Sequence, residues 1–182
     1  IITALLADYL LGEGVENNEV VYDIRSSRVV EEIIAQKGGK ATLNRVGHAF
    51  MKKTLREHNA LFGGELAGHF YFKDFFFADS AIFAFVQVLN ILSKSHVSFH
   101  ELVKKYFKYQ TTGEINFKVK DTDIILNNII EKAKEDSTAK LNYTDGIRID
   151  YPNYWVSIRK SNTEPLLRLV LEAVNSEILE EK

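Results

Sequence analysis

Apolar positions in the first part of the chain follow two different spacings. Segments in which they recur every three or four residues alternate with short β-branched runs, which indicates helices alternating with strands. The expected helices are 1–11, 28–36, 47–58, 79–92 and 98–107, and the expected strands are 19–24, 40–43, 61–62 and 70–72. Strands separated by helices of about ten residues favour a mixed, mainly parallel sheet with crossover helices.

Local signals refine some of these segments. Ser27 is suited to cap the helix that follows it, and Gly63 and Gly64 are expected to break the strand that begins at residue 61. The segment 79–92 is apolar around most of its circumference. A helix of that kind should be well buried. The aromatic run 70–77 has no basic stripe beside it, so it indicates a core strand rather than a surface that stacks on bases.

The pattern changes near residue 108. The polar stretch 109–113 indicates a linker, and the pair Asp145 and Gly146 provides a hairpin signal ahead of two alternating segments. The remaining expected elements are a helix over 122–134 and strands over 114–118, 147–150, 155–159 and 166–171. This order predicts a small α+β unit in which helices back an antiparallel sheet.

The predicted fold therefore has two parts. Residues 1–107 form an α/β unit with a mixed, mainly parallel sheet, and residues 108–182 form a C-terminal α+β unit with an antiparallel sheet. The chain opens inside a helical pattern at Ile1 rather than at a Met, so we expect a fragment or a processed product.

Composition excludes several classes of function. The net charge is −2, so no basic excess points to nucleic acid or to an anionic membrane surface. Residues 1–11 include Asp8 and are too short to span a bilayer. The absence of cysteine excludes disulfides and thiolate metal sites, and it is compatible with a reducing compartment. We expect a cytoplasmic protein with no nucleic-acid or membrane partner.

The segment 159–165 carries the strongest chemical signal. It concentrates a guanidinium, an ammonium, two hydroxyls and an amide between two predicted strands. Planar arginine donors, hydroxyls and exposed backbone N–H groups match the acceptors of a phosphate dianion. Ser, Asn, Thr and Pro are also common turn residues, so the residues alone leave an ordinary polar turn open.

The segment 63–69 carries the second signal. Three glycines flank Glu65 and His69, which indicates a backbone that turns sharply beside polar side chains. A carboxylate can accept hydrogen bonds from two adjacent sugar hydroxyls. The alternative is a glycine-rich turn with an exposed Glu65 and a His69 that only satisfies its own hydrogen bonds.

Both segments resemble a known family. Residues 155–173 resemble the C-terminal signature of the α-D-phosphohexomutases, Arg-Pro-Ser-Asn-Thr-Glu-Pro followed by a strand. In that family the loop grips the phosphate that is not being transferred. The resemblance implies this role for the clamp residues, which are Arg159, Ser161, Asn162 and Thr163. Lys160 replaces the usual Pro, which adds a charge and loosens the backbone.

Residues 63–69 are similar to the family's sugar-specificity loop, Gly-Glu-x-Ser-Gly-His. The resemblance implies that Glu65 binds the 3- and 4-hydroxyls of the sugar and that His69 is the family's imidazole. Ala67 stands at the substrate-binding position where Ser is usual, so one hydroxyl contact is lost or replaced by water or backbone. This departure leaves the hexose preference open.

Two further segments look like parts of the same family. Residues 23–27 resemble a segment that places a basic residue after a strand, which implies that Arg25 faces the cleft. A guanidinium stays protonated, so we favour electrostatic stabilisation by Arg25 over general-base catalysis. Residues 45–50 resemble the turn Val-Gly-His-Ala, which makes His48 a candidate for sugar or phosphate contact and for proton exchange. The alternatives are a solvated Arg25 and a structural His48.

The resemblance covers essentially the whole chain and implies domains three and four of a phosphomannomutase/phosphoglucomutase. Such an isomerase carries out intramolecular phosphoryl transfer on hexose phosphates through a phosphoserine and a bisphosphate intermediate. The family's Ser-His-Asn-Pro loop and its magnesium loop, Asp-Gly-Asp-x-Asp-Arg, are not among these residues. We therefore expect Mg²⁺ in the full-length parent, no metal on this fragment, and no turnover by the fragment alone.

The implied partners are a hexose phosphate and the N-terminal domains of the same chain. His96 and His100 straddle a predicted helix start, so they should not share a face as metal ligands. The alternatives are a phosphoglucosamine mutase fragment, a non-catalytic sugar-phosphate-binding module and a purely structural domain.

Overall fold

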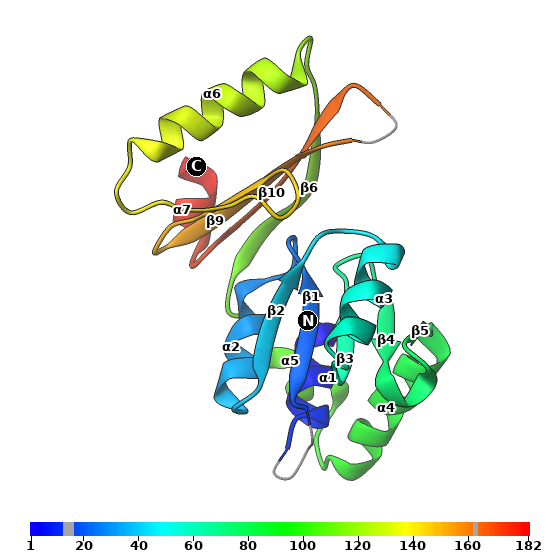
Figure 1. The fold of residues 1–182 in the computed structure, drawn as a ribbon. Helices are drawn as coiled ribbons and strands as arrows, with labels where there is room; N and C mark the ends of the chain where they lie inside the picture. The colour runs from blue at the N-terminus through cyan, green and yellow to red at the C-terminus, as the bar shows by residue number, and fades with distance from the viewer. Residues whose placement is uncertain (13–16, 162–163) are drawn as a thin grey trace. The chain divides into compact units, whose positions relative to one another are not determined.

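The computed structural model describes residues 1–12, 17–161 and 164–182. They form two compact units, Ile1–Lys108 and Tyr109–Lys182 (Figure 1). The predicted clamp residues Asn162 and Thr163 lie outside the described residues.

The N-terminal unit is built on a five-stranded mixed sheet with the order β2-β1-β3-β4-β5. Its strands are β1 (Glu19–Asp23), β2 (Lys40–Asn44), β3 (Phe62–Gly64), β4 (Phe70–Phe72) and β5 (Ala78–Asp79). Strand β1 is parallel to β2 and to β3, whereas β3–β4 and β4–β5 are antiparallel. The parallel strands are joined by two crossover helices, α2 (Arg28–Gln36) and α3 (His48–Glu57).

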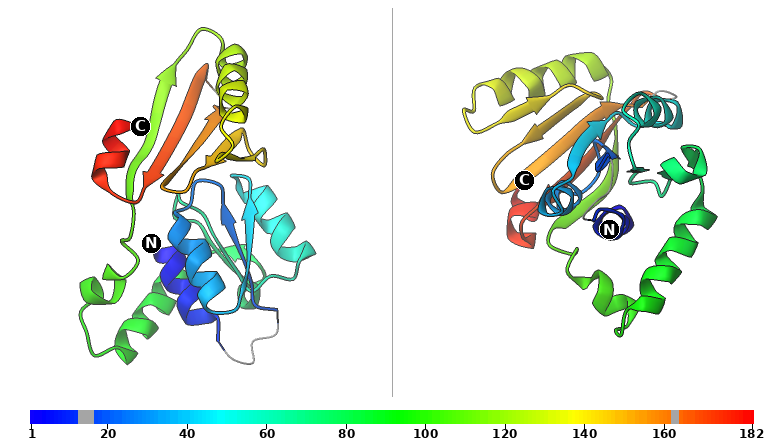
Figure 2. Two further views of the ribbon diagram at one scale, coloured as in Figure 1. Left: turned by 90° about the vertical axis from the view of Figure 1, so that its left-hand side faces the viewer. Right: turned by 60° about the horizontal axis from the view of Figure 1, so that its bottom comes forward.

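Helices α2 and α3 cover opposite faces of this sheet (Figure 2). Val21 of β1 packs with Met51 and Leu55 of α3 in a fully buried cluster. The next residue, Tyr22, donates its hydroxyl proton to Glu31 of α2 at 3.3 Å. Successive side chains of a strand point to opposite faces, so β1 is buried on both sides, as its apolar sequence indicates.

Helix α1 (Ile2–Leu10) packs against α2 and β3. Its Asp8 accepts hydrogen bonds from Lys105 at 2.6 Å and from the Tyr106 hydroxyl at 2.6 Å, and it pairs with Lys37 at 2.8 Å. Burial by itself raises the pKa of Asp8, but these hydrogen bonds outweigh it and lower the pKa to about 2. Asp8 therefore ties α1 to the chain that follows α5 (Phe99–Lys104) and to the end of α2.

Helix α4 (Ala81–Lys94) corrects one prediction. Ser80 caps it by accepting a hydrogen bond from the Phe83 N–H, so it begins two residues after Asp79, which lies in β5. The predicted deep burial is wrong, because Ile82 is 79% exposed and Phe85 is 61% exposed. A helix that is apolar all round but packs along one stripe leaves its other apolar positions in solvent.

Gly63 and Gly64 also behave differently from the prediction, since both lie inside β3 rather than breaking it. A Cβ at Gly64 would lie 2.5 Å from the Cγ2 atom of Thr3 in α1, and one at Gly63 would lie 3.0 Å from Leu55 in α3. The two glycines therefore let helices approach the sheet closely on its two faces.

The C-terminal unit is an antiparallel sheet with the order β6-β10-β9-β8-β7. Its strands are β6 (Gln110–Lys118), β7 (Lys140–Asn142), β8 (Ile147–Asp150), β9 (Tyr154–Lys160) and β10 (Leu166–Ala173). The predicted linker 109–113 is wrong, because β6 already begins at Gln110 and pairs with the end of β10. The hydroxyls of Thr111 and Thr112 donate to the Leu171 carbonyl, so these polar residues support the strand.

One face of this sheet is apolar and packs against α6 (Thr122–Lys134). Asp121 caps α6 by accepting hydrogen bonds from two backbone N–H groups. The predicted hairpin joins β7 to β8, with Gly146 at a φ of 67°. The chain ends with α7 (Ser176–Glu181).

The predicted fold class is confirmed, since a mixed sheet with crossover helices is followed by an antiparallel sheet in an α+β unit. Within the part of the chain that is described, every helix is too short or too polar to cross a bilayer.

Candidate functional site

The turn between β3 and β4 brings Glu65 and His69 together. The Glu65 N–H donates to the His69 carbonyl at 2.9 Å, and the Gly68 N–H donates to the Glu65 carbonyl at 3.0 Å. Gly68 has a φ of 86°, a conformation that side chains disfavour. The glycine-rich sequence therefore closes a tight turn with both polar residues at its base.

Glu65 is only 3% exposed, which excludes the alternative of an exposed, solvated carboxylate. Its Oε1 atom accepts a hydrogen bond from the Tyr71 hydroxyl at 2.6 Å, and its Oε2 atom accepts one from the Gly47 N–H at 3.3 Å. A carboxylate has about four acceptor positions. Glu65 therefore keeps acceptor capacity for a ligand while its orientation is fixed.

Tyr71 links Glu65 to His48. Burial raises the pKa of Tyr71 well above its ordinary value, and the hydrogen bond to Glu65 raises it further. The phenol therefore keeps its single proton, which it donates to Glu65. His48 Nδ1 lies 3.1 Å from the same hydroxyl oxygen, so Nδ1 must carry a proton for this contact to be a hydrogen bond.

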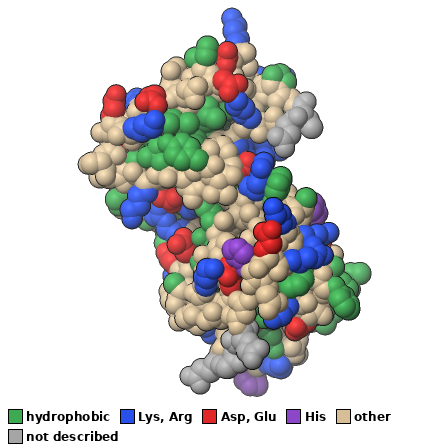
Figure 3. Space-filling model, viewed as in Figure 1, with side chains coloured by type: hydrophobic (Ala, Val, Ile, Leu, Met, Phe, Trp, Pro, Cys, Tyr) green, Lys and Arg blue, Asp and Glu red, His purple; other side chains and the backbone are tan. Residues whose placement is uncertain are grey.

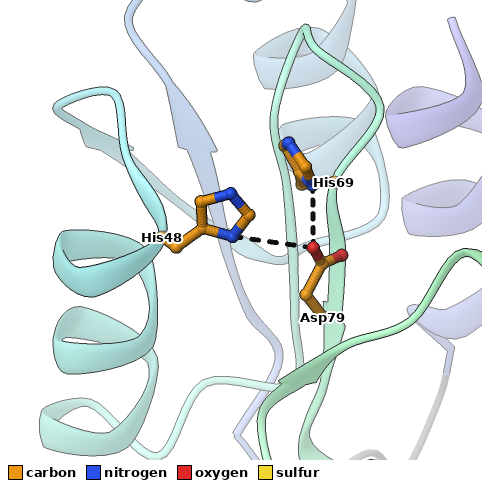
Figure 4. A group of neighbouring side chains, drawn as sticks. All are labelled: His48, His69 and Asp79. Atoms are coloured by element: carbon orange, nitrogen blue, oxygen red, sulfur yellow. Dashed lines mark hydrogen bonds and ion pairs between the residues drawn. The ribbon is translucent and has the colours of Figure 1, made fainter.

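His48, His69 and Asp79 converge beside this pair (Figure 4). His69 Nδ1 lies 2.7 Å from Asp79 Oδ2, and His48 Nδ1 lies 3.6 Å from the same oxygen. The other oxygen, Oδ1, accepts a hydrogen bond from the Phe70 N–H at 3.1 Å. The two imidazole centroids are 4.1 Å apart. Asp79 therefore orients His69 and lies within reach of His48.

Arg25 lies in the turn just after β1 and is mostly buried, which excludes the alternative of a solvated arginine. Its Nη2 atom pairs with Asp23 Oδ2 at 2.7 Å. The same carboxylate accepts hydrogen bonds from the Ser26 hydroxyl at 3.1 Å and from the Leu66 N–H at 3.1 Å. Asp23 therefore fixes Arg25 and joins the end of β1 to the turn that carries Glu65.

Ala67 is exposed at the tip of this turn, next to a half-exposed Leu66. An alanine side chain has no hydrogen-bonding group, so only the backbone at this position can contact a hydroxyl.

In the C-terminal unit, Arg159 of β9 lies directly opposite Arg168 of β10. Glu114 of β6 bridges them, because its Oε2 accepts from Arg159 at 3.0 Å and its Oε1 accepts from Arg168 at 3.1 Å. Arg168 also donates to the Ser161 hydroxyl at 3.4 Å. Like charges directly opposite in a sheet are unfavourable. Glu114 offsets this repulsion between two guanidinium groups on one face.

Lys160 pairs with Asp123 of α6. Because adjacent residues of a strand point to opposite faces, Lys160 lies on the α6 side and Arg159 on the other. The lysine that replaces the family's proline is therefore held away from the Arg159–Arg168 pair.

Sequence reasoning missed several residues that complete these clusters. Asp79 was assigned to a helix, Tyr71 to an ordinary core strand, and Asp23 received no separate role. Glu114 and Arg168 were also missed, although both lie on predicted strands. The structure brings Glu65, His48 and His69 together, and it brings Arg159 to Ser161 through Arg168.

Comparison with known proteins agrees over nearly the whole chain. Residues 1–109 match the family described as phosphoglucomutase/phosphomannomutase, alpha/beta/alpha domain III. Residues 114–181 match the phosphoglucomutase/phosphomannomutase C-terminal domain.

Individual relatives point the same way. A phosphomannomutase of Methanocaldococcus jannaschii is 44% identical over 182 residues, which is 100% of this chain and 40% of that protein. A protein of Xanthomonas campestris pv. campestris described as phosphohexose mutases is 37% identical over 94% of this chain and 38% of its own length. The chain thus spans about two fifths of the relatives it matches.

Solved structures share the fold. A phosphoglucomutase/phosphomannomutase family protein from Burkholderia thailandensis has a TM-score of 0.86 at 27% identity, over 99% of this chain and 38% of its own. An Aspergillus fumigatus N-acetylphosphoglucosamine mutase in complex with GlcNAc-6P and magnesium has a TM-score of 0.71 at 13% identity, over 99% of this chain and 41% of its own; at that identity only the fold is shared. The chain therefore belongs to the phosphoglucomutase/phosphomannomutase family and carries its domain III and its C-terminal domain.

Proposed function

We propose that this chain supplies the sugar- and phosphate-recognition part of a phosphohexomutase of the phosphomannomutase/phosphoglucomutase type. The full-length protein would move a phosphoryl group between two positions of a hexose through a phosphoserine and a bisphosphate intermediate. The observation that carries the proposal is the buried carboxylate of Glu65, which is oriented by Tyr71 and flanked by two imidazoles.

Glu65 is the proposed sugar reader. Each of its oxygens accepts one hydrogen bond from the protein, which leaves acceptor positions for two adjacent sugar hydroxyls. A fixed, buried acceptor discriminates strongly, because a ligand without the matching hydroxyl leaves the carboxylate poorly solvated. This arrangement supports assignment of the 3- and 4-hydroxyls to Glu65.

His48 and His69 are proposed to contact the substrate and to hold or move a proton. Asp79 engages Nδ1 of His69, and the Tyr71 hydroxyl engages Nδ1 of His48. The nitrogen that remains on each ring is Nε2, which can accept a proton from a hydroxyl or donate one to an oxyanion. The hydrogen bonds at Nδ1 therefore select the atom that each ring presents to a ligand.

Arg25 is proposed to stabilise negative charge during the reaction. Its guanidinium stays charged and is held by Asp23 at 2.7 Å, so it is positioned before a ligand arrives. A pre-positioned charge needs little reorganisation when charge develops on a transferring phosphoryl group.

Arg159 and Ser161 are proposed to bind the phosphate that is not being transferred, together with Asn162 and Thr163. Arg168 adds a second guanidinium on the same face of the sheet. Glu114 already occupies donors of both arginines, which shows that these donors converge on one acidic group. A phosphate oxygen can use the same donors.

Magnesium does not fit the donor set that the structure provides. The candidate metal-binding group among the described residues is His48, His69 and Asp79, which offers two imidazole nitrogens and one carboxylate. Mg²⁺ prefers six oxygen ligands. The described residues of this chain are therefore not proposed to hold Mg²⁺. These 182 residues alone should not turn over hexose phosphates. A cytoplasmic location stays a prediction.

The test is an assay of the full-length protein on mannose, glucose and glucosamine phosphates. We expect activity on at least one of them and a loss of about a hundredfold or more in kcat/KM for Glu65→Gln. Glu57→Gln, on the exposed end of α3, is the control and should keep activity. Inactivity of the unmodified protein on all three sugars would refute the proposal.

Ala67 keeps phosphoglucosamine mutase as a second candidate. The Ala67 side chain at the tip of this turn has no hydrogen-bonding group, so it selects none of the three sugars by a hydroxyl or amine contact. The three substrates of the assay distinguish the two candidates. A non-catalytic module would bind a hexose phosphate without any turnover by the full-length protein.

A further inference from the structure

We propose that His48, His69 and Asp79 form a binding site for a zinc-type divalent cation. No metal is expected on these residues from the sequence, and the proposed site does not depend on mutase activity. His48 is the first residue of α3, His69 lies in the turn just before β4, and Asp79 ends β5, so three separate parts of the fold converge at one point (Figure 4).

The ligand atoms are already close to the spacing that zinc needs. His69 Nδ1 and His48 Nδ1 lie 2.7 Å and 3.6 Å from Asp79 Oδ2. One ligand atom from each of the three residues lies within 4.8 Å of the other two. Tetrahedral zinc with bonds of roughly 2.0–2.1 Å places neighbouring ligand atoms roughly 3.3 Å apart. Small movements of these three side chains, well below the length of a side chain, would therefore place all three ligand atoms around one zinc ion.

The donor types select the ion. Two imidazoles and one carboxylate suit Zn²⁺ and similar transition metals, whereas Mg²⁺ and Ca²⁺ require mostly oxygen. Three protein ligands leave a fourth position for water or another small ligand. The side chains of His48, His69 and Asp79 are 50%, 38% and 24% exposed, so the ion has a path to the site.

The surrounding hydrogen bonds hold the ligands in place. The Phe70 N–H engages Asp79 Oδ1 at 3.1 Å and leaves Oδ2 facing the two rings. When Nδ1 of each neutral imidazole binds the ion, the proton of that ring moves to Nε2 and no net proton is released. Tyr71 gives up its contact with His48 Nδ1 but keeps its hydrogen bond to Glu65.

A bound zinc ion would also change the sugar site, a consequence that rests on the proposed function. The same imidazoles that are proposed to contact the substrate would then be metal ligands with altered orientation. Zinc should therefore compete with the hexose phosphate, and it should inhibit the full-length enzyme in a way that a chelator reverses.

The direct test uses the chain and zinc sulfate alone. Competition with a chromophoric zinc indicator near neutral pH should reveal one tight site per chain. His69→Gln and Asp79→Asn should each weaken that site about tenfold or more. His96→Gln, which removes an imidazole outside the cluster, should leave it unchanged. Magnesium sulfate should not displace the ion.

Either of two results would overturn the site. One is equally tight zinc binding by the His69 and Asp79 variants, and the other is an equal loss in His96→Gln, which would indicate ordinary surface histidines. If His69→Gln does not fold, His48→Gln replaces it, because His48 is half-exposed at a helix start. The zinc titration contains no sugar. The zinc proposal can therefore fail while the mutase assay succeeds, and the mutase assay can fail while zinc binding is found.

Discussion

The hydroxyl of Tyr71 offers the sharpest test of how the proposed sugar site is built. Its ring is fully buried, and its oxygen donates to Glu65 at 2.6 Å. Burial, and then the contact with Glu65, raise the pKa of Tyr71, so the phenol is neutral at working pH. Tyr71→Phe therefore removes one hydrogen-bond donor and no charge.

The loss of stability in Tyr71→Phe follows from the hydrogen bond that Glu65 no longer accepts. A hydrogen bond to a charged group contributes about 1.5–3 kcal/mol, and Phe keeps the ring and most of the packing. Glu65 is 3% exposed, so solvent can replace the lost donor only in part. We expect the N-terminal unit to lose about 2 kcal/mol of its free energy of unfolding.

Two probes follow the unfolding of the two units separately in urea. The single tryptophan, Trp155, lies in the C-terminal unit, so its fluorescence reports that unit. Hydrogen exchange of amides in β1 and β3 reports the N-terminal unit. Tyr71→Phe should lower protection in β1 and β3 and should leave the fluorescence midpoint unchanged.

The matched control is Tyr9→Phe. The Tyr9 hydroxyl accepts hydrogen bonds from Asn90 and Lys94 near the surface, where water can replace it, so the loss should be below about 0.5 kcal/mol. If Tyr71→Phe costs no more than Tyr9→Phe, the hydroxyl does not hold Glu65 and the reasoning about this site is wrong.

Three further predictions concern other parts of the chain. The pKa of Asp8 falls from 3.8 to about 2 on folding, so its stabilisation is present above about pH 4 and is lost as the pH falls toward 2. Asp8→Asn should therefore lower the free energy of unfolding by about 1 kcal/mol at neutral pH, after allowance for solvent screening, and by almost nothing near pH 2. An equal loss of stability at the two pH values would contradict this prediction. Glu114→Gln should raise the affinity for inorganic phosphate about fivefold, because it removes the anion that Arg159 now binds; an unchanged dissociation constant in calorimetry would contradict this. Gly64→Ala should cost about 1–3 kcal/mol in urea unfolding, because its Cβ would lie 2.5 Å from an atom of α1, whereas Gly12→Ala meets nothing within 4 Å and should cost little.

Much of the fold could be predicted because local signals agreed with each other. The helices over 28–36 and 122–134 have the predicted bounds, and each is preceded by a capping side chain, Ser27 or Asp121. Apolar spacing and a cap act within one or two turns of helix, so one sequence is enough to find them.

The errors arose where distant contacts decide the outcome. Gly63 and Gly64 signal a break by propensity, but they remain in β3 because helices approach the sheet there. The polar residues Gln110 and Thr111 pair with β10, which the local pattern cannot show. The exposed apolar positions of α4 depend on what packs beside the helix rather than on its own composition.

The residues of the candidate site also fall into those that the sequence could show and those that only the fold could show. Motif resemblance selected Glu65 and His69 because both lie in one short turn. Tyr71 of β4 contacts Glu65 and Asp79 of β5 contacts His69. These contacts depend on the pairing of β4 with β5, which the sequence does not show. Ala67 and Lys160 were the departures visible in sequence, and the structure places Ala67 exposed at the tip of the turn.

Titration of the chain with mannose 6-phosphate, followed by amide NMR, tests the central assignment most directly. We predict millimolar binding that shifts the signals of Glu65, His69 and Ser161 and that weakens about tenfold or more in Glu65→Gln, but not in Glu57→Gln. Unmoved signals at all three residues, or equal affinity in the Glu65 variant, would contradict the account.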